Sequence, residues 1–214
     1  MNLYSGTTNR SALLTKASRL ADRLGIARAA LKVRALAGSP VGLTLTLSFG
    51  EVEVQRSCAS QPGKDENLGA LTQWLEDLAR NQERGIEHLG EALHGDGLSL
   101  ALFDAADCEP RAARTNRYQG DMSAQEAWEL VCKSAARLDL PERAVWLGRD
   151  GDTAVLRLDL GGRVVEKRSE RQDGARANAA AIALWMQCRA RHFERGIDRD
   201  LVRVMSAYLL PGGA

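Results

Sequence analysis

Four basic residues near the N-terminus form the pattern in this sequence that most directly suggests a binding chemistry. A helix would carry three of them along one face, with the fourth one to two turns earlier; they are Lys16, Arg19, Arg23 and Arg10. The first fifty residues hold seven Lys or Arg against one Asp or Glu, whereas residues 51–100 hold four against ten. Such a face could contact phosphates or an acidic protein surface, or it could balance the acidic residues of its own unit.

A second basic group lies near the end of a predicted strand and the start of the helix that follows it. It consists of Lys167, Arg168, Arg171 and Arg176. We assign the two groups together as candidate nucleic-acid-binding residues. Three phosphate contacts from the first group would predict duplex binding without sequence readout, with a log–log salt slope of about −2 to −3.

No set of residues identifies a reaction. Asp159 followed by Glu166-Lys167 has the order found in restriction-type nucleases, but adjacent strand residues point to opposite faces. The three histidines have no positioned nucleophile or acid nearby in the sequence, and no phosphate-binding loop or dinucleotide fingerprint occurs. We therefore expect no catalytic residue, no metal site and no cofactor, and an enzyme with a site assembled across two units is the least favoured alternative.

Cysteine usage and hydropathy indicate the compartment. The four cysteines are widely scattered and none forms a C-x-x-C pair, which is typical of free thiols in a reducing cytoplasm. No apolar run approaches the roughly 20 residues that cross a bilayer, so we expect a cytoplasmic protein that has no membrane partner.

The elements that must position these residues occur twice. Residues 67–86 and 178–197 are identical at nine of twenty positions with a constant offset of 111, and the shared residues include Trp74/Trp185 and Asn67/Asn178. Unrelated segments would share about one, so the chain is an internal duplication. Because the period is long, it indicates two duplicated domains and not a solenoid.

The residue pattern of each copy predicts a helix, then three strands, then a second helix. The predicted helices and strands of the first copy are 10–24, 30–36, 43–49, 51–56 and 67–86, and those of the second are 124–137, 144–149, 154–160, 163–168 and 178–197. A short helix is expected after each copy, at 87–93 and 198–209. We predict an α+β fold with two α-β-β-β-α repeats at 1–97 and 123–214, each a three-stranded antiparallel meander with helices on one face. Residues 98–122 are predicted to form a linker or long loop, within which 98–103 could add a strand.

The apolar stripe of the shared helix predicts the core. Leu71, Leu75 and Ile86, with the equivalents Ile182, Met186 and Ile197, should lie against a sheet. Trp74 and Trp185 lie beside this stripe and should seal the edge of the core. Gly85 and Gly196 are expected to end the helices in the left-handed conformation that glycine adopts without strain.

Two families share parts of this pattern. The α-β-β-β-α order resembles double-stranded-RNA-binding domains, although only Arg56 and Lys64 represent that family's basic cluster in the first copy. The hairpin followed by Asn-x-x-Ala-Leu/Ile and Glu-Arg-Gly-Ile resembles the region upstream of the J-domain in phage and archaeal J-domain proteins. That family's His-Pro-Asp tripeptide is missing here, so the resemblance implies a non-catalytic module in a phage or mobile-element setting and transfers no active residues.

The sequence thus predicts a non-enzymatic binding or adaptor protein that acts on nucleic acid or within a nucleoprotein complex. The alternative is a purely protein-binding module, in which the units present helices or an exposed sheet edge to a protein partner.

Overall fold

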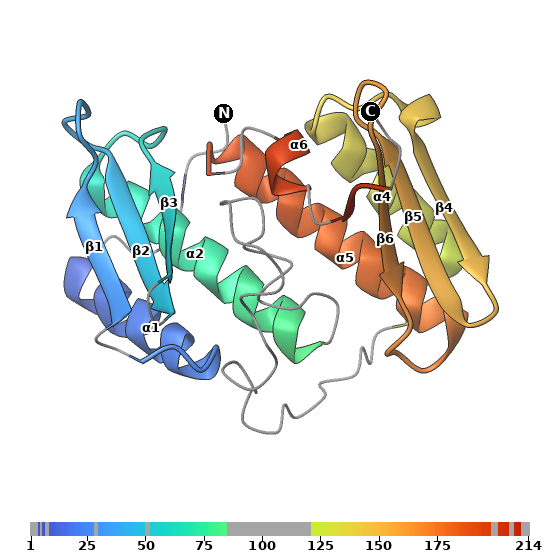
Figure 1. Cartoon of the computed structure of the whole chain (residues 1–214), viewed down its shortest axis with the longest axis horizontal. Coiled ribbons are helices and arrows are strands. Elements are labelled where there is room, and N and C mark those ends of the chain that lie inside the picture. The colour runs from blue at the N-terminus through green and yellow to red at the C-terminus, as the bar shows by residue number, and fades with distance from the viewer. Residues whose placement is uncertain are drawn as a thin grey trace.

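The fold is α+β and consists of two copies of one unit (Figure 1). In the computed structural model, the described residues are Tyr4, Gly6 and the ranges 9–27, 30–49, 52–84, 121–197, 201–205 and 208–210. The first unit comprises α1 (Arg10–Arg23), β1 (Leu31–Ala35), β2 (Leu43–Phe49), β3 (Val52–Cys58) and α2 (Lys64–Glu83). The second comprises α4 (Ala124–Arg137), the short 3-10 helix η4 (Glu142–Ala144), β4 (Val145–Asp150), β5 (Thr153–Asp159), β6 (Val164–Ser169), α5 (Gly174–Glu194) and α6 (Leu201–Val204).

The predicted order of helices and strands is confirmed. Most of their observed boundaries differ from the predicted ones by a few residues. Residues 98–120 of the expected linker, the helix at 87–93 and the strand at 98–103 lie outside the described residues. Within the range expected for the last helix, 198–209, the described helical part is α6.

Each unit is a sheet with helices on one face. The strand orders are β1-β2-β3 and β4-β5-β6, antiparallel throughout. The two sheets lie at opposite ends of the molecule, and α2 and α5 lie side by side between them (Figure 1). The inward face of β2 supplies three almost completely buried leucines, Leu43, Leu45 and Leu47, as its two-residue alternation predicts.

The predicted helix stripe is confirmed as core. Leu71, Leu75, Ile182 and Met186 are completely buried. Trp74 and Trp185 are buried as well, so they belong to the core interior and not to its edge. Ile86 and Gly85 lie outside the described residues, whereas Gly196 has the predicted left-handed φ of 69°.

The buried asparagines show how closely the two copies correspond. Asn67 Nδ2 donates to the carbonyls of Val41 and Gly63 at 3.0 and 2.8 Å, and its Oδ1 accepts from Gln61 N. Asn178 makes the same contacts 111 residues later. Its Nδ2 donates to the carbonyls of Asp152 and Gly174 at 2.8 and 3.2 Å, and its Oδ1 accepts from Gln172 N. Each side chain therefore joins the start of the long helix to the turn before the middle strand.

The two copies are also joined to each other by helix ends. Gln172 Nε2 donates to the carbonyl of Arg84 at the end of α2. In the reciprocal contact, Ser60 Oγ, ahead of α2, donates to the carbonyl of Arg195 at the end of α5. The start of each helix therefore meets the end of the other, and α2 and α5 run antiparallel as in a two-fold symmetric dimer. Ile197 packs into the core of the first copy, so the second copy completes part of that core.

A buried ion pair lies in the middle of this interface. Asp77 Oδ2 lies 3.0 Å from His192 Nε2, and its Oδ1 lies 3.4 Å from Arg191 Nη2. Burial by itself would raise the pKa of Asp77, but the hydrogen bond from His192 and the nearby positive charges hold it below its ordinary value of 3.8. The residues 111 positions from Asp77 and His192 are Cys188 and Asn81, so this pair has no symmetric counterpart.

Candidate functional site: a groove between the first helix and the first strand

The first helix, α1, carries an apolar side chain that the core does not cover. Leu13 and Ala17 face inward and are completely buried. Leu14, the next residue after Leu13, lies 100° further around the helix and is 38% exposed. It is one of two large hydrophobic residues that are exposed in the described part of the chain, the other being Trp146.

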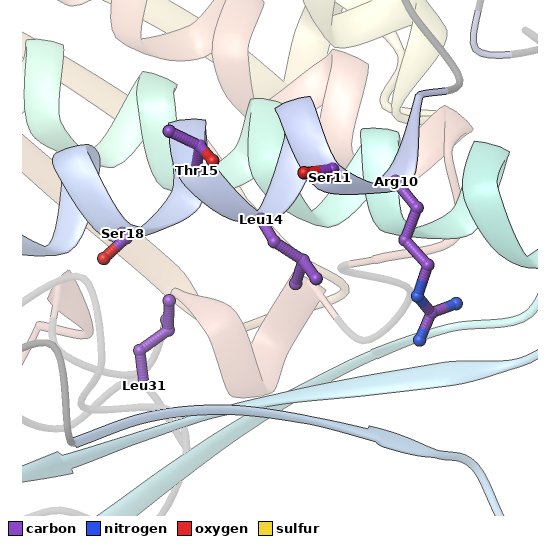
Figure 2. A pocket seen from close by; sticks show the side chains of 6 residues that line it. All are labelled: Arg10, Ser11, Leu14, Thr15, Ser18 and Leu31. Atoms are coloured by element: carbon purple, nitrogen blue, oxygen red, sulfur yellow. The ribbon is translucent and has the colours of Figure 1, made fainter.

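Leu14 lies in a groove between α1 and the edge of the sheet. The groove has a volume of about 590 Å³, and its lining consists of Arg10, Ser11, Leu14, Thr15, Ser18 and Leu31. Figure 2 shows Leu14 reaching from the helix toward the strands, with Leu31 beside it on the strand side. A second hollow of about 540 Å³ shares Ser11 and Thr15 and continues along α1 to Lys16 and Arg19. The small hydroxyl side chains leave room above the two leucines.

The wall opposite α1 is the edge strand β1. In the described sheet, β1 pairs with β2 on one side only. Leu36 N donates to the carbonyl of Gly42, which fixes which residues of the hairpin exchange hydrogen bonds with β2. In an antiparallel pair these residues alternate, so Lys32 and Arg34 bond to β2 while the backbone groups of Leu31, Val33 and Ala35 point to the open edge.

The side chains of β1 divide between two faces. Leu31 and Val33 face the helices and are only partly buried, unlike the leucines of β2. Lys32 and Arg34 face the opposite side and are exposed. The edge of β1 therefore combines backbone donors and acceptors that have no partner strand in the described sheet, partly buried apolar side chains and two positive charges.

The second copy lacks this combination. Helices α1 and α4 have the same length, so Trp128 occupies the position of Leu14, and it packs against the second core. By strand register, Val145 takes the place of Leu31 and is 7% exposed. The hydroxyl residues Ser11 and Thr15 are replaced by the longer Gln125 and Glu129. The core positions correspond in the two copies, so among the described residues the groove at Leu14 and Leu31 is a feature of the first copy.

The structure brings the first predicted basic group together on α1, mostly in ion pairs with α2. Lys16 Nζ lies 2.7 Å from Glu76 Oε2, and Arg23 makes two hydrogen bonds to Glu83 at 2.7 and 2.8 Å. Arg10 lies 3.7 Å from Asp65 and also lines the groove. Arg19 is exposed in the adjoining hollow. This arrangement matches the alternative in which the helix balances acidic residues of its own unit.

The second predicted basic group is not brought together. Lys167 points inward, is 4% exposed and lies 4.6 Å from the centre of the Tyr208 ring. Arg168 faces outward and bonds to Glu166 at 2.7 Å. Arg176 donates to the carbonyls of Met122 and Asp121, and Arg171 is exposed in the turn before α5. Lys167 is therefore separated from the three arginines of this group, which are exposed.

The residues weighed for a nuclease are also separated. Glu166 and Lys167 lie on opposite faces of β6, as the strand alternation predicts, and Glu166 is held between Arg157 and Arg168. Asp159 accepts a hydrogen bond from Gly162 N and caps the hairpin turn. Over the described ranges, no group of three His, Cys, Asp or Glu side chains is arranged to hold a metal ion.

Sequence reasoning missed Leu14 because it lies outside the helical stripe that identifies the core. The signal that could have found it is the comparison of the copies, since a helix offset of 114 places Leu14 opposite Trp128. The strand offset likewise aligns the basic pair Lys32 and Arg34 with Trp146 and Gly148.

No helix in the described part of the chain is both long and apolar enough to cross a membrane. Comparison with protein-family models, with curated proteins and with solved structures finds no match.

Proposed function

We propose that this protein is a non-enzymatic adaptor that binds an extended segment of a partner protein in the groove between α1 and β1. The segment would add a strand to the open edge of β1 and place alternate side chains over Leu14 and Leu31. Main-chain hydrogen bonds would give affinity, and the groove would select the side chains. The observation that carries this proposal is an exposed leucine facing an edge strand whose inward side chains are only partly buried.

The geometry favours a protein partner over nucleic acid. Two of the basic side chains expected to meet phosphates, Lys16 and Arg23, already hold Glu76 and Glu83 at 2.7–2.8 Å. A phosphate would have to displace these carboxylates or lie beside them, which reduces the electrostatic gain on which non-specific nucleic-acid binding depends. A peptide strand would not have to displace Glu76 or Glu83, because it would bind the edge of β1 and the apolar floor of the groove.

Selection from a displayed library of random 12-residue peptides on the purified full chain tests this function. The matched variant is Leu14→Trp, which fills the groove with the side chain that the second copy has at that position. Enriched peptides should bind the wild type and should bind the variant about tenfold to a hundredfold more weakly, because one leucine contact is worth about 1.5–3 kcal/mol. Peptides that bind the folded Leu14→Trp variant as tightly as the wild type would show that the groove is not the site.

A further inference from the structure

The charges on β1 identify the kind of segment that the groove would accept. Resting on the proposed function, we infer that the partner segment alternates apolar and acidic residues. Side chains directly opposite each other on adjacent strands interact when they share a face of the sheet. An added strand would therefore meet Leu31 and Val33 with one set of side chains, and Lys32 and Arg34 with the other.

The two faces impose different chemistry on that strand. On the helix side, residues at every second position would cover Leu14, Leu31 and Val33, which favours aliphatic side chains. On the other side, the intervening positions would lie next to Lys32 and Arg34, where opposite charges stabilise and like charges destabilise. Lys32 now lies 3.5 Å from Glu53, but both side chains are nearly half exposed, so this pair is weak enough to accept a second carboxylate.

The basic residues at the rim of the groove carry the same positive charge as Lys32 and Arg34. Arg10 lines the groove, where its pair with Asp65 is long at 3.7 Å and about half exposed, and exposed Arg19 lines the adjoining hollow. In the second copy the positions of Lys32 and Arg34 hold Trp146 and Gly148, and the first turn of α4 contains Glu126. The preference for acidic residues is therefore a property of the first copy alone.

A second copy of this chain is a poorer occupant. Antiparallel pairing of β1 with another β1 would bring Lys32 and Arg34 of the two chains next to each other on one face. Basic side chains on an edge strand are a common means of preventing such self-association. The same charges that oppose a second copy attract an acidic strand.

Three labelled 12-residue peptides with alternating patterns test the inference by fluorescence anisotropy on the full chain. All alternate Val or Leu with a second residue, which is Glu in one, Ser in the next and Lys in the last. The Glu peptide should bind about tenfold more tightly than the Ser peptide at low salt, and this preference should shrink as salt rises. The Lys peptide should bind most weakly.

Two variants connect the preference to β1. Lys32→Glu/Arg34→Glu should abolish or reverse the preference for Glu over Ser. Arg149→Glu/Arg163→Glu makes the same change of net charge on exposed residues of the second copy and should leave the preference intact. If the Glu and Ser peptides bind the wild type equally well and both bind Leu14→Trp more weakly, the acidic preference is wrong and the groove function stands. If none of the three peptides binds, the proposed function fails with it.

Discussion

Asp77 and His192 lie 3.0 Å apart in the centre of the interface between the two copies, and both side chains are almost completely buried. They come from α2 and α5, the equivalent helices of the two copies, yet they do not occupy equivalent positions. Two identical copies would place such a pair twice across their two-fold axis. The single pair shows that the two faces are complementary and not identical.

Replacing Asp77 by Asn should destabilise the protein by about 3 kcal/mol at neutral pH, because Arg191 would lose its buried counter-charge and His192 its charged hydrogen-bond partner. The pKa of Asp77 is lowered in the folded state, so its stabilising effect is present above pH 3.8 and is lost as pH falls through the folded value. Urea unfolding at several pH values should show wild type and variant converging in acid. A constant difference down to pH 2 would contradict the ion pair.

The buried asparagines Asn67 and Asn178 should contribute equally to the free energy of unfolding. Asn67→Ala and Asn178→Ala each leave backbone groups of two turns without their partner, which we expect to cost about 3 kcal/mol. Chemical unfolding of both variants measures this. A large cost in one copy and a negligible cost in the other would show that the duplicated contacts do not have duplicated roles.

Leu75→Ala tests the packing of the shared helix. Leu75 is completely buried against the first sheet, so its truncation should cost about 2–4 kcal/mol. Exposed Leu14 provides the matched control, since Leu14→Ala should cost less than about 1 kcal/mol. Equal losses at the two positions would mean that the helix faces are wrongly assigned.

Much of this fold could be predicted because the residues that form an apolar pattern along a helix or strand are also the ones that are buried. The alternation of residues 43–49 and the stripe through Leu71 and Leu75 each specify one buried face, and the repeat doubles the evidence. Contacts between the copies could not be predicted in the same way. Nothing local indicates that Ile197 enters the core of the other copy, or that Asp77 meets His192, since those contacts depend on how the units pack.

The candidate site likewise has features that the sequence predicts and features that it does not. Sequence identified the basic row on α1, but not that Lys16 and Arg23 would find carboxylates on α2 sixty residues away. Lys167 and Arg168 are neighbours in sequence, and the strand alternation alone sends them to opposite faces. The groove itself depends on a gap between helix and strand, which periodicity does not encode.

Nucleic-acid binding remains a separate prediction with a direct test. Titration of labelled duplex and single-stranded oligonucleotides at two salt concentrations should show no measurable affinity at about 0.15 M salt if the basic row serves its own unit. Binding with a log–log slope of about −2 to −3, lost in Lys16→Glu/Arg19→Glu/Arg23→Glu, would instead support the polyanion surface.

Amide hydrogen exchange of β1 tests the central claim most directly. The amides of Lys32 and Arg34 point to β2, whereas those of Val33 and Ala35 point to the open edge. At one fixed concentration of the alternating Val/Glu peptide, exchange at Val33 and Ala35 should slow in the wild type and slow much less in Leu14→Trp. If the peptide binds while Val33 and Ala35 exchange as in the unbound protein, no strand has been added to β1 and the proposed mode of binding is wrong.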